Sequence, residues 1–79
     1  MKVVQIQGPS GSTLAVFEVV VEDGGEVVSL IRAPDGGPPR EARGRYASAK
    51  DALKRNNRAT TTASVVDVAD IEAARALVM

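Results

Sequence analysis

The side chains of this chain that could do chemistry are carboxylates and hydroxyls, because the sequence contains neither His nor Cys. Without an imidazole or a thiolate there is no common general base, no activated thiol and no transition-metal site of the usual type. Ser10 and Ser12 have no activating base nearby in the sequence and are typical of a turn. Glu22, Asp23 and Glu26 are close enough to hold a divalent cation weakly, but solvated charges at a sheet end explain them better. The sequence therefore predicts no catalytic residue, no metal and no cofactor.

A glycine-rich run at residues 8–13 looks like a shortened phosphate-binding loop of the nucleotide-hydrolysing ATPases. Such a loop needs backbone amides, a Lys for the phosphates and a helix directly behind it. This chain has no Lys between Gly8 and Val19, and the residues after Thr13 alternate as in a strand. We therefore expect a hairpin turn that binds no nucleotide.

Charge is distributed unevenly along the chain. Ten basic and ten acidic residues give a formal net charge of zero. Residues 40–58 nevertheless hold seven basic and two acidic residues, a charge of +5, which leaves −5 for the remainder. This split predicts a contact surface for a partner. Its candidate residues are Arg40, Arg43, Arg45, Tyr46, Lys50, Lys54, Arg55 and Arg58.

Two kinds of partner fit this basic segment. Lys50, Lys54 and Arg58 are spaced by four and would form one stripe on a helix, which suits a phosphate backbone, while Tyr46 could stack on a base. An acidic protein or the acidic part of a second copy would suit the same stripe. A solvated face is the alternative without a partner, and Tyr46 would then pack at the helix start with its hydroxyl in water. The chain is neutral overall, which favours self-association over nucleic acid.

The first half of the chain is predicted to form an antiparallel meander. Val4 and Ile6 alternate with glutamines as in a strand, which the turn cluster at residues 8–12 ends. Residues 14–22 and 26–32 form the next two strands, joined by a hairpin at Asp23-Gly24-Gly25.

Alternation within these strands predicts the core. It places Phe17, Val19 and Val21 on one face, with Leu30 beside them on the next strand, so Phe17→Ala should cost about 3–5 kcal/mol. Both faces of the second and third strands are substantially apolar. The second face therefore needs another helix or another subunit.

The second half of the chain is predicted to contain two helices and up to two further strands. Ser48-Ala49-Lys50-Asp51 has the form of a capping box, and the helix that it opens ends near Asn56. Asp67 is a good N-cap for a last helix, whose apolar positions are Val68, Ile71, Ala74 and Val78. Residues 34–39 are a loop, whereas residues 40–46 and 60–66 are optional strands.

The layout of residues 17–67 resembles the YegP-like domains, small β-β-β-α units of unknown function. The matching patterns are the Phe17-Glu18-Val19 hairpin, the Asp35-Gly36 turn, Tyr46-Ala47-Ser48 before a helix and Ala63-Ser64-Val65-Val66-Asp67 after it. The resemblance implies a sheet backed by a helix, and it brings no functional residues.

Together these observations predict a single α+β domain over residues 1–79. Its three- or four-stranded antiparallel sheet packs with two helices in the order β-β-β-(β)-α-(β)-α. We expect a small bacterial-type, cytoplasmic protein, since no apolar run approaches the ~18–20 residues of a membrane span. Its expected function is a non-catalytic binding or protein-interaction module that self-associates, because a chain of this size buries a small core. The alternative is a nucleic-acid-binding protein that uses residues 40–58.

Overall fold

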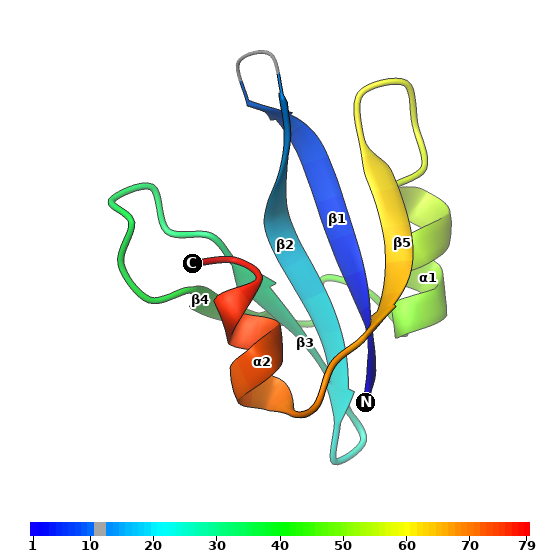
Figure 1. Cartoon of the computed structure of the whole chain (residues 1–79). Coiled ribbons are helices and arrows are strands. Elements are labelled where there is room, and N and C mark those ends of the chain that lie inside the picture. The colour runs from blue at the N-terminus through cyan, green and yellow to red at the C-terminus, as the bar shows by residue number, and fades with distance from the viewer. Residues whose placement is uncertain (11–12) are drawn as a thin grey trace.

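A five-stranded antiparallel sheet lies between two helices in the computed structural model, which describes residues 1–10 and 13–79 (Figure 1). The strand order is β4-β3-β2-β1-β5. The predicted α+β class is confirmed, but the sheet has five strands rather than three or four, because both optional strands form. The elements are β1 (Lys2–Ser10), β2 (Thr13–Asp23), β3 (Glu26–Ile31), β4 (Arg40–Arg43), α1 (Ala49–Arg55), β5 (Thr62–Asp67) and α2 (Ile71–Ala76).

The N-terminal strand β1 lies inside the sheet, between β2 and β5. It pairs with β5 from Lys2 opposite Asp67 to Gln7 opposite Thr62. A helix covers each face of this region, so neighbouring residues Val3 and Val4 are both buried although they point to opposite faces. A strand that is covered on both faces needs apolar residues at successive positions, as Val3 and Val4 provide.

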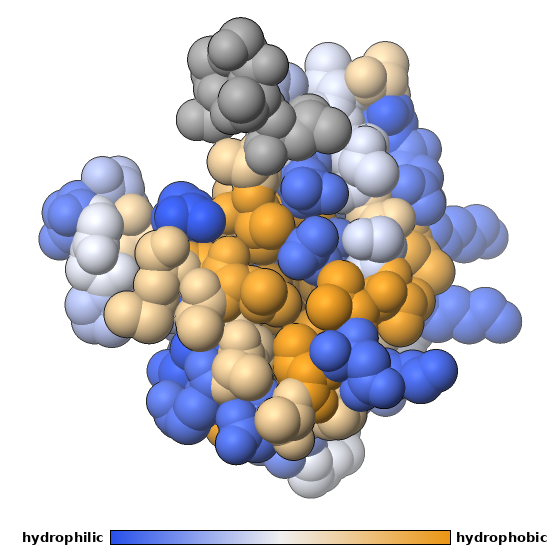
Figure 2. Space-filling view, viewed as in Figure 1, coloured by the Kyte–Doolittle hydropathy of each residue, from blue (hydrophilic) through white to orange (hydrophobic). Residues whose placement is uncertain are grey.

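The face of the sheet beneath α2 carries a wholly aliphatic core. Valines of β1, β2 and β3 meet the underside of α2 there. On the surface of this side of the molecule, hydrophobic residues gather around the centre of the view (Figure 2). Of the two covers expected for the second face, a helix or another subunit, the structure shows a helix, α2. The buried members of this cluster are Val3, Val19, Val21, Val28, Leu30, Ala74 and Val78.

The opposite face is covered by α1, and here one predicted position is wrong. Phe17 packs in the α1 cluster with Val4, Ile6 and Val20, not with Val19 and Val21. The cause is a β-bulge: Ile6 lies opposite Glu18 but Gln7 lies opposite Val16, so Phe17 is an extra residue in β2. An extra residue shifts the alternation of the strand from that point on.

The β2–β3 hairpin forms as predicted. Gly24 and Gly25 have φ angles of 59° and 83°, the left-handed values that a tight two-residue turn needs at both positions. Strand β1 runs further than expected, because Gly8 and Pro9 belong to it and Ser10 lies opposite Thr13. Gly11 and Ser12 of the glycine-rich run lie outside the described residues.

The predicted cap is confirmed for the first helix and wrong for the second. The Ser48 hydroxyl accepts the backbone N–H of Asp51 at 3.0 Å, and the Asp51 carboxylate accepts the N–H of Ala47 at 3.1 Å. For α2 the cap is Asp70, which accepts the N–H of Ala73 at 2.9 Å. Asp67 instead ends β5 and lies 3.4 Å from the N-terminal ammonium. Val68, the residue after Asp67, still donates its N–H to the Met1 carbonyl, so the chain stays extended past Asp67 and α2 begins only after Asp70.

Candidate interaction surface

The basic segment 40–58 does not form one continuous patch. Its first part is β4, an edge strand of the sheet, whereas α1 packs over β1, β2 and β5 toward the other edge (Figure 1). Arg40 and Arg43 therefore lie on the β4 side, and Lys50, Lys54 and Arg55 lie on the α1 side. The structure divides the eight candidate residues into two groups, joined by Arg45 and Tyr46.

Much of the charge split is neutralised within the chain. The Arg43 guanidinium lies 2.6 Å from the Glu26 carboxylate, and this exposed hydrogen bond raises the pKa of Arg43. Arg45 donates two hydrogen bonds to Glu18, at 3.0 and 3.3 Å. Both carboxylates belong to the acidic remainder, so these two arginines of the segment are paired within the chain and not left for a partner.

The Arg45–Glu18 pair differs from the Arg43–Glu26 pair in that its carboxylate is buried. The side chain of Glu18 is only 2% exposed, on the α1 face of β2, while that of Arg45 is 47% exposed. A buried carboxylate needs such a partner, because an unpaired charge away from water is costly. The hydrogen bond from Arg45 to Glu18 raises the pKa of the guanidinium, so Arg45 stays charged wherever the protein is folded.

Tyr46 is a structural residue in this arrangement. Its ring packs on the α1 cluster, with the Arg45 guanidinium 5.7 Å from the ring centroid. Its hydroxyl accepts a hydrogen bond from the Asn56 side-chain amide at 3.1 Å. The expected packing at the helix start is found, but the hydroxyl is bonded to Asn56 rather than left to water.

Some of the cations on and just after α1 have no carboxylate partner among the described residues. Arg55 lies 3.9 Å from Asp51, whereas Lys50, Lys54 and Arg58 make no ion pair in the part of the chain that the structure describes. The predicted stripe is shorter than expected, because α1 ends at Arg55 and Arg58 lies beyond the helix. The Arg58 guanidinium donates a hydrogen bond to the backbone carbonyl of Arg55 at 2.9 Å. Two exposed lysines on the helix form what remains of the stripe.

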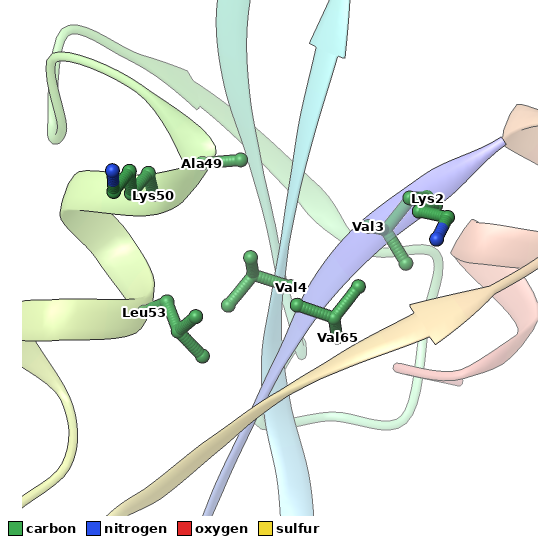
Figure 3. A pocket seen from close by; sticks show the side chains of 7 residues that line it. All are labelled: Lys2, Val3, Val4, Ala49, Lys50, Leu53 and Val65. Carbon is green, nitrogen blue, oxygen red and sulfur yellow. The ribbon is translucent and has the colours of Figure 1, made fainter.

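Beside these lysines an apolar groove of about 280 Å³ opens between α1 and the strands β1 and β5 (Figure 3). Val4 forms its floor, Leu53 stands on the helix side and Val65 on the strand side (Figure 3). Val65 is 53% exposed and forms part of the rim of this groove. The complete lining is Lys2, Val3, Val4, Ala49, Lys50, Leu53 and Val65.

The sequence alone does not indicate this groove, because it predicts residues 60–66 only as an optional strand and the lysines as a separate stripe. The groove exists only because β5 pairs with β1, a contact between residues about sixty positions apart. The one local signal is the β-branched pair Val65-Val66, which predicts a strand and not a surface.

Two of the three acidic hairpin residues, Glu22 and Glu26, have structural partners. Glu22 accepts the backbone N–H of Ala49 at 2.6 Å, and Glu26 binds Arg43. Within the described residues, no group of three or more acidic side chains is placed to hold a metal ion. In the same part of the chain, no helix has the length and apolarity that crossing a membrane requires.

Comparison with known proteins finds no matching family model, no similar curated protein and no similar solved structure. The resemblance to the YegP-like domains therefore stays a prediction.

Proposed function

We propose that this protein is a non-catalytic protein-interaction module that self-associates through the side of the molecule formed by α1 and β5. The observation that carries the proposal is the apolar groove with the exposed Val65 at its rim and, beside it, Lys50, which has no carboxylate partner in residues 1–10 and 13–79. An apolar centre with a charged rim is the usual anatomy of a protein-binding surface.

Self-association also suits the small core. The chain has 79 residues, and its largest fully buried side chains, apart from Glu18 and Ser29, are aliphatic and mostly valine. Burying the groove and Val65 against another copy would add apolar area that the single chain leaves in water.

Nucleic acid is the second candidate, favoured by Lys50, Lys54 and Arg58. Against it, Tyr46 is engaged with Asn56 and the α1 cluster, and Arg43 and Arg45 are paired with carboxylates. Lys50, Lys54 and Arg58, which make no ion pair within the described part of the chain, would together give a slope of log affinity on log salt of roughly −3. The five to seven contacts that the whole segment offers would give roughly −4 to −6.

The test is molecular mass in solution, from micromolar to millimolar protein, at low and high salt and with added single- and double-stranded DNA and RNA. We expect an oligomer that the triple variant Lys50→Glu, Lys54→Glu, Arg58→Glu shifts toward monomer. The control is Arg40→Glu, a cation on the β4 side, which should leave the mass unchanged. A wild-type protein that stays monomeric and binds RNA in a salt-dependent way contradicts the proposal and favours the second candidate.

A further inference from the structure

The two outer edges of the sheet differ in their ability to accept another strand. β4 has four residues, three of them charged, and follows Pro38 and Pro39. Short, charged edges next to proline resist the addition of a strand. β5 has six residues, of which residues 62–66 are uncharged. The β5 edge is therefore the one open to pairing.

The hydrogen-bonding direction of each β5 residue follows from its pairing with β1. Met1 and Val68 exchange two backbone hydrogen bonds, at 2.8 and 2.5 Å. In an antiparallel ladder, hydrogen-bonded pairs alternate with non-bonded ones. The register then directs the backbone groups of Thr62, Ser64 and Val66 toward β1. Those of Ala63, Val65 and Asp67 point outward.

One outward group is already occupied. The N–H of Ala63 donates to the side-chain oxygen of Asn57 at 3.1 Å. This bond confirms the outward direction, and it closes the first part of the edge to another strand. The N–H and C=O groups of Val65 and Asp67 remain as the docking points.

We infer that a second copy of this chain docks on β5, antiparallel and with the two-fold axis at Val66, so that the two sheets become one. The inference rests on the proposed self-association and names its interface. Val65 and Asp67 of each copy exchange two hydrogen bonds with Asp67 and Val65 of the other, four in all. A two-fold axis at Ser64 or at Val65 would need the N–H of Ala63, which Asn57 already binds.

Side-chain chemistry favours the same register. Asp67 of the second copy comes to lie next to Val65, on the face where Lys2 and Lys50 border the groove. Each copy thus brings to the other's lysines a carboxylate that is 75% exposed, although within its own copy it also lies 3.4 Å from the N-terminal ammonium. On the opposite face the two Val66 side chains meet in a non-hydrogen-bonded pair, where side chains approach most closely.

The decisive variant is Val65→Pro. Proline removes the outward N–H of Val65 but none of the bonds from β5 to β1, so the monomer keeps its ladder. We expect the dimer to dissociate roughly tenfold or more readily, since two of its four hydrogen bonds are lost. The matched control is Arg43→Pro, which removes an outward N–H from the β4 edge and should leave the dimer unchanged. A dimer that survives Val65→Pro with unchanged affinity overturns the inference and leaves self-association standing.

Amide hydrogen exchange of the unmodified protein gives a second test, which does not depend on the folding of any variant. Raising the protein concentration should slow exchange at Val65 and Asp67 and leave Glu41 and Arg43 of β4 unchanged. Protection that appears at β4, or at α1 without β5, places the interface elsewhere. A protein that never associates removes both this interface and the proposed function.

A charge exchange tests the register itself. Lys50→Asp and Asp67→Lys should each weaken the dimer, and the double variant should recover it, because the charges meet across the interface. Additive weakening in the double variant contradicts the register about Val66.

Discussion

The two faces of the sheet are each covered by one short helix, yet they are built from different chemistry. Beneath α2 the buried residues are all aliphatic or Ala. Beneath α1 the apolar cluster lies beside a buried carboxylate, Glu18, which Arg45 must neutralise. The α1 face also leaves a groove open at Val65. The α2 face thus has a hydrophobic core with a partly exposed ion pair, Arg75–Glu41, beside it, whereas the α1 face holds a buried carboxylate and unfilled space that a partner can use.

The largest difference should appear when the same side chain is shortened on each face. Leu30 is fully buried under α2, and Leu53 is half-buried beside the groove. Leu30→Ala should lower the free energy of unfolding by about 2–5 kcal/mol, because it leaves a cavity in a packed core. Leu53→Ala should cost about 1–2 kcal/mol, since water already reaches part of that side chain. Denaturant unfolding of both variants measures this, and equal losses would show that the faces are equally packed.

The next difference lies in two arginines that each bind a glutamate. Arg45→Ala leaves the buried Glu18 without its partner and should cost about 1–3 kcal/mol. Arg43→Ala leaves Glu26, whose side chain is 61% exposed, and should leave the stability nearly unchanged, because water solvates both groups. Thermal unfolding at neutral pH compares the two, and Arg45→Lys shows how much charge alone restores. Similar shifts for both alanine variants would mean that water reaches Glu18.

The smallest effect concerns the bulge. A Cβ on Gly8 would lie 2.9 Å from the Phe17 ring, closer than real contacts allow. Gly8→Ala should therefore cost about 1–2 kcal/mol, and Phe17→Leu should relieve part of that loss in the double variant. Because Phe17 is half-buried, Phe17→Ala should itself cost less than the about 3–5 kcal/mol expected for a buried ring. A double-mutant cycle by calorimetry measures the coupling, and strict additivity would place the ring away from Gly8.

Local patterns predicted much of the fold because their causes are local. The Asp23-Gly24-Gly25 turn, the Ser48 cap and the burial of Val19, Val21 and Leu30 each depend on neighbouring residues or on a period-2 repeat. Phe17 was placed on the wrong face because a bulge depends on the facing strand, which alternation in β2 cannot show. Asp67 was taken for a helix cap because the sequence does not show that β1 extends the chain there.

The candidate site was predicted less well than the fold. The sequence by itself determined the uneven charge, the strand-forming residues and the lack of His and Cys, because these are properties of composition and spacing. Only the tertiary structure decided that Arg43 and Arg45 are bound by carboxylates from β3 and β2, and that Lys50 is left beside a groove. The physical reason is distance along the chain. Ion pairs and grooves form between residues that only the completed sheet brings together, so the order of the strands fixes which charges are neutralised and which stay available to a partner.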